Sequence, residues 1–371
     1  MPPLHLLIKP ASGLCNLRCD YCFYRDETRN RETASFGRMT EQTLATVLEK
    51  ALRYATGSLT VAYQGGEPTL RGLSFFQRSI ELQRQLNHKG IPIHNAIQTN
   101  GCGLTEEWAR FFADHHFLVG LSLDGKRDTH NACRHTTDGG ETYAEVLKTA
   151  RLFDRLHVDY NILTVVNAYT ARRAESIYRF YRQNGFAYLQ FIPCLDPLGE
   201  PPGGRPYSLR PQAYGTFLKT LFDLWYRDLL AGQAVSIRQF DNYVDMLRGH
   251  PPESCGMAGV CAPQHVVEAD GSVYPCDFYV LDRWRLGSLL ECDFADIAAA
   301  RASSGFVELS RQVDEQCRAC RFGPLCRGGC RRYREPMRDG KLERNQFCES
   351  YQAFFAHAAD RLAQLAACPA L

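Results

Sequence analysis

The sequence predicts an α/β fold in which six βα units form a partial barrel, followed by a smaller cysteine-rich module. Two observations support this prediction. Short apolar segments alternate with amphipathic helical stretches through the first two thirds of the chain. Ten of the sixteen cysteines then fall after residue 254. We therefore expect a parallel sheet in the first part and a fold built around cysteines in the second.

Six segments are expected to be strands of one parallel sheet. Successive right-handed βα units place their strands parallel, and six units favour an open, partial barrel over a closed barrel of eight. A flat, doubly wound sheet is the alternative architecture. The expected strands are His5–Lys9, Leu59–Gln64, Ile93–Gln98, Leu118–Leu123, Tyr160–Val166 and Tyr188–Pro193.

Helical periodicity and a change in composition predict the domain organisation. Glu41–Tyr54 and Gln212–Leu230 both have the spacing of apolar residues that is typical of helices. Residues 196–211, rich in Pro and Gly, are expected to form a loop before the second of these helices. We place the boundary near residue 235, which predicts a barrel domain over residues 1–235 and a cysteine-rich domain over residues 236–371.

Composition excludes several classes of protein. With 43 Lys and Arg against 41 Asp and Glu, the chain has no basic stripe that would neutralise a nucleic-acid backbone. It has no run of about 18 apolar residues and no signal-peptide pattern, so neither a membrane span nor export is expected. We predict a cytoplasmic protein, in which metal binding explains the cysteines better than disulfides do.

The most informative segment is a cysteine triplet near the N-terminus. Cys15, Cys19 and Cys22 follow a C-x3-C-x2-C spacing, with Tyr21 and Phe23 flanking the last cysteine. Three thiolates can bind three irons of a [4Fe-4S] cluster and leave the fourth iron open to a small chelating molecule. A zinc knuckle or buried structural thiols are the alternatives, but zinc usually takes four ligands and this loop has no fourth Cys or His. The triplet therefore favours a cluster with an open site.

Short polar motifs stand at the ends of three expected strands. Gln64-Gly-Gly-Glu-Pro68 follows the second strand, Gln98-Thr-Asn-Gly101 the third, and Ser122-Leu-Asp-Gly125 ends the fourth. Because working residues of βα barrels gather at the C-terminal ends of the strands, these motifs are expected to share one rim. The Gly-Gly pair would let the backbone approach a ligand, although alone it indicates only a turn.

Eight cysteines in the C-terminal third have spacings that suit two four-ligand metal sites. In an isolated domain, zinc would fit these spacings as well as iron-sulfur clusters would. The cluster triplet upstream favours iron-sulfur. The eight are Cys255, Cys261, Cys276, Cys317, Cys320, Cys326, Cys330 and Cys348.

Taken together, the motifs resemble the anaerobic sulfatase-maturating enzymes, a family of the radical S-adenosylmethionine superfamily whose C-terminal module is named SPASM. The implied fold is a partial (β/α)6 radical SAM barrel with a cysteine-rich SPASM domain holding two auxiliary iron-sulfur clusters. One departure is Leu14 between Gly13 and the first cysteine, where the family pattern leads us to expect Gly. Besides the triplet and the Gly-Gly-Glu-Pro turn, the matching segments are Ile8-Lys-Pro10, Gln98-Thr-Asn-Gly101, Tyr274-Pro-Cys-Asp-Phe-Tyr-Val-Leu281 and Gly328-Gly-Cys-Arg-Arg332.

The resemblance implies three [4Fe-4S] clusters and bound S-adenosyl-L-methionine. The triplet would hold the cluster that binds this cofactor, and Gly66 would contact the methionyl amino group. By the same resemblance, Ser122 and Arg134 would contact the cofactor, and Tyr21 and Leu195 would line its adenine and ribose. The alternative is local hydrogen bonding or solvation for Ser122 and Arg134, and plain packing for Tyr21 and Leu195. The auxiliary ligand sets would be Cys255, Cys261, Cys276 and Cys330 for the first cluster, and Cys317, Cys320, Cys326 and Cys348 for the second.

The reaction implied is the oxidation of one cysteine or serine of an unfolded sulfatase, within a Cys/Ser-x-Pro-x-Arg segment, to Cα-formylglycine. A 5'-deoxyadenosyl radical would abstract hydrogen from the substrate Cβ, and Asp277 would remove the thiol or hydroxyl proton. Without the resemblance, Asp277 would be interpreted as a loop-capping carboxylate. Tyr24 and Gln64 would position the substrate. The auxiliary clusters would accept the released electron, and a flavodoxin- or ferredoxin-like protein would be the electron donor.

Two other functions also fit parts of the pattern. A SPASM-type maturase could form a thioether or carbon-carbon crosslink in a ribosomal peptide, although such enzymes commonly carry a recognition domain before the triplet and fourteen residues precede Cys15 here. A non-catalytic iron-sulfur or zinc scaffold would leave the open site of the triplet unexplained. The motifs favour neither cysteine-type nor serine-type sulfatases.

Overall fold

The computed structural model describes residues 3–233 and 235–368, which divide into two compact units. Each unit draws on segments from both sides of residue 235, and the division into domains at that residue remains a prediction. Within the described ranges, no helix combines the length and the apolar character needed to span a bilayer. The first unit comprises Met1–Ser122, Arg134–Tyr160 and Pro263–Phe306, and the second comprises Leu123–Cys133, Asn161–Ala262 and Val307–Leu371.

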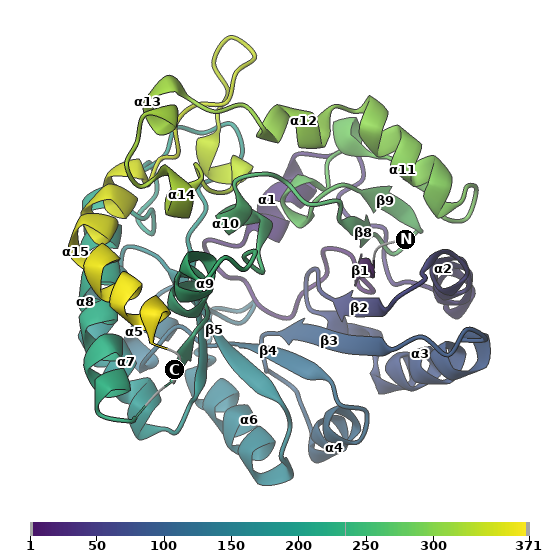
Figure 1. Cartoon of the computed structure of the whole chain (residues 1–371). Helices are drawn as coiled ribbons and strands as arrows, with labels where there is room; N and C mark the ends of the chain where they lie inside the picture. Colours follow the sequence, from purple (N-terminus) through teal and green to yellow (C-terminus); the bar gives the residue numbers. More distant parts are fainter. Residues whose placement is uncertain (1–2, 234, 369–371) are drawn as a thin grey trace. The chain divides into compact units, whose positions relative to one another are not determined.

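A parallel sheet forms the centre of the first unit (Figure 1). Its strands β1 to β4 are neighbours in sequence order, and a helix lies in each connection between them. Alternate side chains of β2, such as Val61 and Tyr63, are buried, as expected for strands with one face against a core. The strands are β1 (Leu4–Ile8), β2 (Leu59–Tyr63), β3 (Ile93–Thr99) and β4 (Leu118–Ser122).

Three short strands from residues 265–288 extend this sheet beyond β1. Strand β8 runs parallel to β1, with Leu6 opposite His265, and β9 and β10 follow as antiparallel neighbours. Sequence patterns do not predict these strands, because two or three residues are too few to display a period of two. The pairing brings the segment after β9 next to the loop after β1. The strands are β8 (His265–Val267), β9 (Ser272–Tyr274) and β10 (Gly287–Ser288).

The pairing of β8 with β1 should make the fold sensitive to acid through His265. Burial and the nearby Arg301 lower the pKa of His265 to about 4, although the carbonyl of His5 accepts from its ring at 3.3 Å. The pKa of His265 in the folded protein lies below that of an unfolded histidine. The contribution of neutral His265 to the free energy of unfolding is therefore fully present above about pH 6.5 and is lost as the pH decreases toward 4. We expect a loss of about 2 kcal/mol between pH 7 and 5. His265→Gln should flatten this part of the stability profile in thermal unfolding, and an unchanged profile would contradict the assignment.

Helices cover the outer side of the first sheet (Figure 1). Helix α2 begins after Thr40, whose side chain accepts from the backbone of Thr43 at 3.0 Å and so caps the helix. Its apolar residues recur every three or four positions and face α3 and the sheet. The covering helices are α2 (Glu41–Tyr54), α3 (Leu73–Leu86), α4 (Glu106–Asp114), α6 (Tyr143–Leu156) and α11 (Phe294–Ser303). Helix α1 (Phe23–Arg29) is not one of them, and it contacts the 3-10 turn Asp277–Tyr279 instead.

The second unit combines three parallel strands with a helical layer. Strand β6 pairs with β5 and β7, and α8 packs against α7 and α15. The rings of Phe222, Phe240 and Phe354, all buried, join α8, α9 and α15 with centroids 5.3 to 5.7 Å apart. The strands and long helices are β5 (Tyr160–Val166), β6 (Tyr188–Pro193), β7 (Ser236–Ile237), α7 (Ala174–Gln183), α8 (Pro211–Leu230), α9 (Arg238–Leu247) and α15 (Cys348–Ala367).

The described chain also contains five short α-helices, besides 3-10 helices at Pro68–Arg71, Ala171–Arg173, Asp277–Tyr279, Asp282–Trp284 and Arg331–Arg334. Four of the short α-helices carry or adjoin the cysteine-rich segments, where metal ligands rather than apolar periodicity are expected to define the local fold. The five are α5 (Arg127–His130), α10 (Cys255–Ala258), α12 (Phe306–Ser310), α13 (Glu315–Arg318) and α14 (Gly323–Cys326).

The predicted elements are confirmed closely. All six expected strands are present, with ends that differ by at most one residue, and the two expected helices are α2 and α8. Residues 196–210 form an irregular loop, as their Pro and Gly content predicts.

Candidate functional site

The cysteine triplet lies on the loop between β1 and α1, with half-buried thiols. Cys22 is the residue immediately before α1. The backbone N–H of Leu17 donates to Cys15 Sγ at 3.3 Å, and the side-chain amide of Asn100 lies 3.7 Å from the same sulfur. Burial raises the pKa of Cys15 to about 12, despite these donors, so a free thiol would keep its proton at neutral pH. The loop thus presents sulfur donors that a bound metal group would have to deprotonate.

The donor set fits a cluster with one open iron. Among residues 3–233 and 235–368, no three His, Cys, Asp or Glu side chains surround the position of a single metal ion. In a [4Fe-4S] cluster each thiolate binds a different iron, so the thiols need not converge on one point. Three cysteines on one loop, with N–H groups directed at Cys15, satisfy that requirement.

The turn after β2 is fixed to the triplet loop through backbone hydrogen bonds. Gly66 N donates to Ser12 O at 2.8 Å, and Glu67 N donates to Leu14 O at 2.7 Å. A Cβ on Gly66 would stand 2.0 Å from the carbonyl oxygen of Leu14, which is much closer than a van der Waals contact. Glycine at this position is therefore required by the approach of the two loops.

The buried carboxylate of Glu67 connects this turn to the end of β3. It accepts from Thr69 N at 3.1 Å, Thr69 Oγ1 at 2.7 Å, Thr99 Oγ1 at 2.9 Å and Asn100 N at 2.8 Å. Asn100 in turn donates through its side chain to Asn16 Oδ1 at 2.8 Å. Burial raises the pKa of Glu67, and these donors oppose the shift. Two sequence motifs and the triplet loop thus belong to one hydrogen-bond network.

Asp277 stands at the start of a short 3-10 turn after β9. Tyr24 Oη donates to Asp277 Oδ2 at 2.7 Å. The other oxygen, Oδ1, is buried, and it has no hydrogen-bond partner among the described residues. Burial raises the pKa of Asp277, while the charge of Lys9 and the Tyr24 hydrogen bond oppose the shift. An unpartnered carboxylate oxygen of this kind is available to take a proton from a bound molecule.

A group of buried charges supports Tyr24 and Asp277 from behind. Lys9 Nζ lies 3.0 Å from Glu268 Oε1, 3.7 Å from Glu27 Oε2 and 5.0 Å from the ring centroid of Tyr24. Arg31 donates to Glu268 Oε1 at 2.7 Å. Burial raises the pKa of Glu27, and Lys9 opposes the shift. Sequence reasoning missed Glu27, Arg31 and Glu268, because no motif contains them and Glu268 lies 237 positions beyond Arg31.

Removal of Lys9 should therefore destabilise the first unit. In Lys9→Met, Glu268 keeps Arg31 as a partner, but Glu27 loses its only cation within 4 Å among the described residues. We expect a loss of about 3 kcal/mol in the free energy of unfolding, measured by urea titration under anoxic conditions. The double variant Lys9→Met/Glu27→Gln should recover part of this loss. A double variant no more stable than the single one would contradict the proposed pairing.

The residues matched to cofactor contacts are distributed over both units. In the first unit, the guanidinium of Arg134 lies 5.4 Å from the ring centroid of Tyr21, and its charge opposes the rise that burial causes in the pKa of Cys22. Ser122 ends β4 and is buried. Leu195 is buried in the loop after β6, in the second unit. The structure thus brings Tyr21 and Arg134 to the triplet.

The second unit gathers the second predicted ligand set in one hollow. A cavity of about 390 Å³ is lined by all four cysteines of this set, which come from α13, α14, α15 and the loop between the first two of these helices. The hollow is therefore suited to a four-thiolate metal group. The four are Cys317, Cys320, Cys326 and Cys348.

Three members of the first predicted set also lie in the second unit. Helix α10 begins at Cys255, and a Cβ at its Gly256 would stand 3.4 Å from Cys330 Cβ. Burial raises the pKa of Cys330 to about 12, and the thiolates of Cys255 and Cys261 contribute to the rise. These three cysteines are thus neighbours. The fourth, Cys276, belongs to the first unit.

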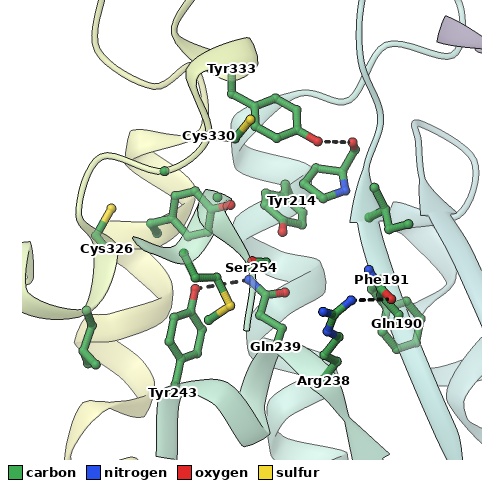
Figure 2. A pocket seen from close by; sticks show the side chains of 17 residues that line it. Gln190, Phe191, Tyr214, Arg238, Gln239, Tyr243, Ser254, Cys326, Cys330 and Tyr333 are labelled. Carbon is green, nitrogen blue, oxygen red and sulfur yellow. Dashed lines mark hydrogen bonds between the residues drawn. The ribbon is translucent and has the colours of Figure 1, made fainter. Parts of the chain in front are cut away.

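A smaller cavity of about 160 Å³ lies between cysteines of the two sets (Figure 2). Cys330 and Cys326 both line it, together with several tyrosines. Tyr333 Oη donates to the carbonyl of Pro193 at 2.6 Å, and Gln239 Nε2 donates to Tyr243 Oη at 3.2 Å. Sequence reasoning missed this cavity, because apart from Cys326, Gly329 and Cys330 its lining residues belong to no motif.

Comparisons with known proteins identify the family. Residues 10–181 match the Radical SAM superfamily model, and residues 260–321 match SPASM, an iron-sulfur cluster-binding domain. Over 366 residues the chain is 48% identical to a cysteine-type anaerobic sulfatase-maturating enzyme of Clostridium perfringens strain 13, a match that covers 99% of both proteins. The chain belongs to the anaerobic sulfatase-maturating enzymes. It is accordingly a radical S-adenosylmethionine oxidoreductase, whose matched domains bind a [4Fe-4S] cluster with S-adenosylmethionine and further iron-sulfur clusters.

Other relatives place this maturase within the family. A serine-type anaerobic sulfatase-maturating enzyme of Bacteroides thetaiotaomicron is 29% identical and covers 96% of this chain and 90% of its own length. The solved structure of native anSMEcpe with bound AdoMet and Cp18Cys peptide is 46% identical, with a TM-score of 0.94 over 98% of this chain and 99% of that one. The predicted partial barrel with a SPASM domain is thereby confirmed. Streptococcus suis SuiB with its precursor peptide SuiA, at 17% identity and a TM-score of 0.66 over 93% of this chain and 76% of that one, shares the fold alone.

Proposed function

We propose that this maturase oxidises the cysteine of a Cys-x-Pro-x-Arg segment in an unfolded sulfatase to Cα-formylglycine. The observation that carries the choice of cysteine is the contrast in identity between the two classes of relative. Cysteine-type enzymes are 44% to 48% identical over nearly the whole chain, whereas serine-type enzymes are 29% to 30% identical. The Cp18Cys peptide in the anSMEcpe structure supports a peptide substrate.

The cofactor would be held by the triplet and the residues around it. Cys15, Cys19 and Cys22 would bind a [4Fe-4S] cluster, which together with S-adenosylmethionine supplies a hydrogen-abstracting radical when both are bound. Gly66 is proposed to contact the methionyl amino group through its backbone. Arg134 is suited to the cofactor carboxylate, because a guanidinium makes strong paired hydrogen bonds to carboxylates. The residues proposed for the remaining contacts are Tyr21, Ser122 and Leu195.

Asp277 is proposed to accept the thiol proton of the substrate. The Tyr24 hydroxyl holds one carboxylate oxygen at 2.7 Å and thereby directs the other, which has no partner among the described residues. Burial raises the pKa of Asp277 toward neutral pH, and a base with a pKa near the working pH takes up and releases protons efficiently. The charge of Lys9 opposes this rise in the pKa and so favours the ionised carboxylate. Gln64, whose side chain contacts Gln98, is proposed to help position the peptide.

Two auxiliary [4Fe-4S] clusters are proposed to bring the total to three. The hollow lined by Cys317, Cys320, Cys326 and Cys348 supports the second of these, and the proximity of Cys255, Cys261 and Cys330 supports the first, with Cys276 as its fourth ligand. Such clusters supply an acceptor for the electron that substrate oxidation releases. A flavodoxin- or ferredoxin-like protein is proposed as the electron donor.

Mass spectrometry of a synthetic peptide tests this function. The reconstituted enzyme is incubated without oxygen with S-adenosylmethionine, a reductant and a Cys-x-Pro-x-Arg peptide, and in parallel with the serine counterpart. Replacement of CH2–SH by CHO lowers the cysteine peptide by about 18 Da, whereas oxidation of serine lowers its peptide by about 2 Da. We expect the cysteine product to form faster. Cleavage of the cofactor with both peptides unchanged would overturn the proposed function.

A further inference from the structure

Exposed arginines surround the hollow that holds the second cysteine set. Arg318, Arg327 and Arg344 line the same cavity as Cys317, Cys320, Cys326 and Cys348. All three arginines are exposed, and none forms an ion pair with a carboxylate within the described ranges. Their polar contacts are with neutral groups: Arg327 Nε donates to the carbonyl of Pro324 at 3.0 Å, and Arg344 donates to the side chain of Gln316. Their charges are therefore available to a partner.

Positive charge is concentrated in this part of the chain. Residues 311–349 contain ten of the 43 basic residues and six of the 41 acidic ones, so acidic residues predominate in the remainder. A fourth exposed arginine, Arg321, lies with its guanidinium 4.5 Å from the ring of Phe322, which lines the hollow. Glu315 and Glu349 are the exposed carboxylates nearest in sequence to the lining cysteines, and neither is in the lining of the hollow.

Apolar side chains line the same hollow as the three arginines. Val313, 40% exposed, lines the hollow together with Val260 and Pro324. A small apolar centre with a charged rim is typical of protein contact surfaces, and weak electron-transfer complexes have the smallest of these. Charges on the rim mainly accelerate encounter with a partner of opposite charge.

We propose that Arg318, Arg327 and Arg344 form the docking surface for an acidic one-electron carrier protein of the flavodoxin or ferredoxin class. The proposal rests on the proposed function, which places an iron-sulfur group within the same hollow. A protein partner suits this surface better than a small anion does, because the arginines are exposed and line a cavity of about 390 Å³ together with apolar side chains.

The electron balance of the reaction explains why a carrier should dock near an auxiliary site. Converting CH2–SH to CH=S breaks one C–H and one S–H bond: a hydrogen atom goes to the nucleoside, a proton to the base, and one electron remains. Reductive cleavage of S-adenosylmethionine consumes one electron. A carrier that gives one electron and takes one back therefore ends each turnover in its starting state, and water then converts the thioaldehyde to the aldehyde with release of hydrogen sulfide.

Binding of a carrier to the holoenzyme tests the proposal. Fluorescence anisotropy of a labelled, FMN-loaded flavodoxin gives the dissociation constant at low salt. It is measured for the wild type and for Arg318→Glu/Arg327→Glu/Arg344→Glu, called the rim variant below. We expect the dissociation constant to rise by about tenfold or more, with the difference shrinking as salt screens the charges. The triple variant Arg84→Glu/Arg172→Glu/Arg210→Glu reverses the same number of exposed charges elsewhere and should change binding less than about threefold. Equal weakening by both triple variants, or none by the rim variant, would overturn the proposal.

Further arms separate this proposal from its alternatives. The charge-preserving Arg318→Lys/Arg327→Lys/Arg344→Lys should keep nearly normal flavodoxin binding, and iron content verifies that each variant is loaded. Inorganic phosphate that displaces flavodoxin at concentrations where chloride of equal ionic strength does not would indicate an anion site and overturn the carrier assignment. With dithionite as reductant, the rim variant should form formylglycine as the wild type does. If the wild type formed no formylglycine with dithionite, the proposed function would be rejected. The anisotropy measurement of flavodoxin binding would still test the docking surface independently.

Discussion

Asp277→Asn is expected to reduce formylglycine formation by about 100-fold or more while cofactor cleavage continues. Asparagine keeps an oxygen that can accept from Tyr24 Oη, so the local geometry survives, but it cannot take up the substrate proton. In the proposed mechanism, cleavage of S-adenosylmethionine does not use this carboxylate. Quantifying 5'-deoxyadenosine and modified peptide in the same reaction measures both effects. Wild-type product yield in the variant would remove Asp277 as the base.

Two control variants separate proton transfer from structural damage. Tyr24→Phe removes the hydrogen bond that orients the carboxylate, and we expect a smaller loss of product, about tenfold. Glu27→Gln removes a carboxylate from the same buried group without touching Asp277 Oδ1. Since Gln cannot carry the negative charge either, Glu27→Gln controls for the change in buried charge near Lys9. Equal losses in Glu27→Gln and Asp277→Asn would indicate a general electrostatic role instead.

Gly66→Ala is expected to abolish cofactor cleavage almost completely, with a loss of about 100-fold or more. Its Cβ would lie 2.0 Å from Leu14 O, so either the turn or the triplet loop must move and the hydrogen bond from Gly66 N to Ser12 O would be strained. A displacement of this size at the position of a reacting cofactor is costly even when the fold survives. The rate of 5'-deoxyadenosine formation and the iron content per chain measure the effect.

Gly57→Ala provides the matched control for this change. Nothing lies within 4 Å of a Cβ added at Gly57, so it tests the substitution of glycine by alanine without a clash. We expect its cofactor cleavage to match the wild type. Wild-type cleavage in Gly66→Ala would show that the two loops need not approach as closely as the structure has them.

Local patterns were sufficient to predict the strands and the motif-bearing loops. The strands of the barrel are five to seven residues long and bounded by turn residues, so their ends follow from the sequence to within one residue. The triplet and the Gly-Gly-Glu-Pro turn can be recognised from the spacing and type of their residues. That the carboxylate of Glu67 would bind Thr99 and Asn100 could not be predicted, since hydrogen-bond partners from another strand depend on the packing.

Long-range pairing was the part that local patterns could not supply. Glu27 accepts from the backbone of Val280 at 3.1 Å, and Arg31 binds Glu268, although 253 and 237 positions separate these pairs. Neither periodicity nor composition carries information on such contacts. The same holds for Lys9, because its ion pair with Glu268 depends on the pairing of β8 with β1.

The pairing of β1 with β8 has a consequence for how the enzyme is made. Strand β1 leaves the ribosome about 260 residues before its partner His265–Val267, which corresponds to at least roughly 13 s of translation. Until then one edge of β1 is open, and Lys9 lacks the carboxylate of Glu268. The triplet loop therefore reaches its final environment late in synthesis. A cluster loaded before β8 is synthesised would bind a loop that still lacks these contacts, so loading is favoured after β8 has paired with β1.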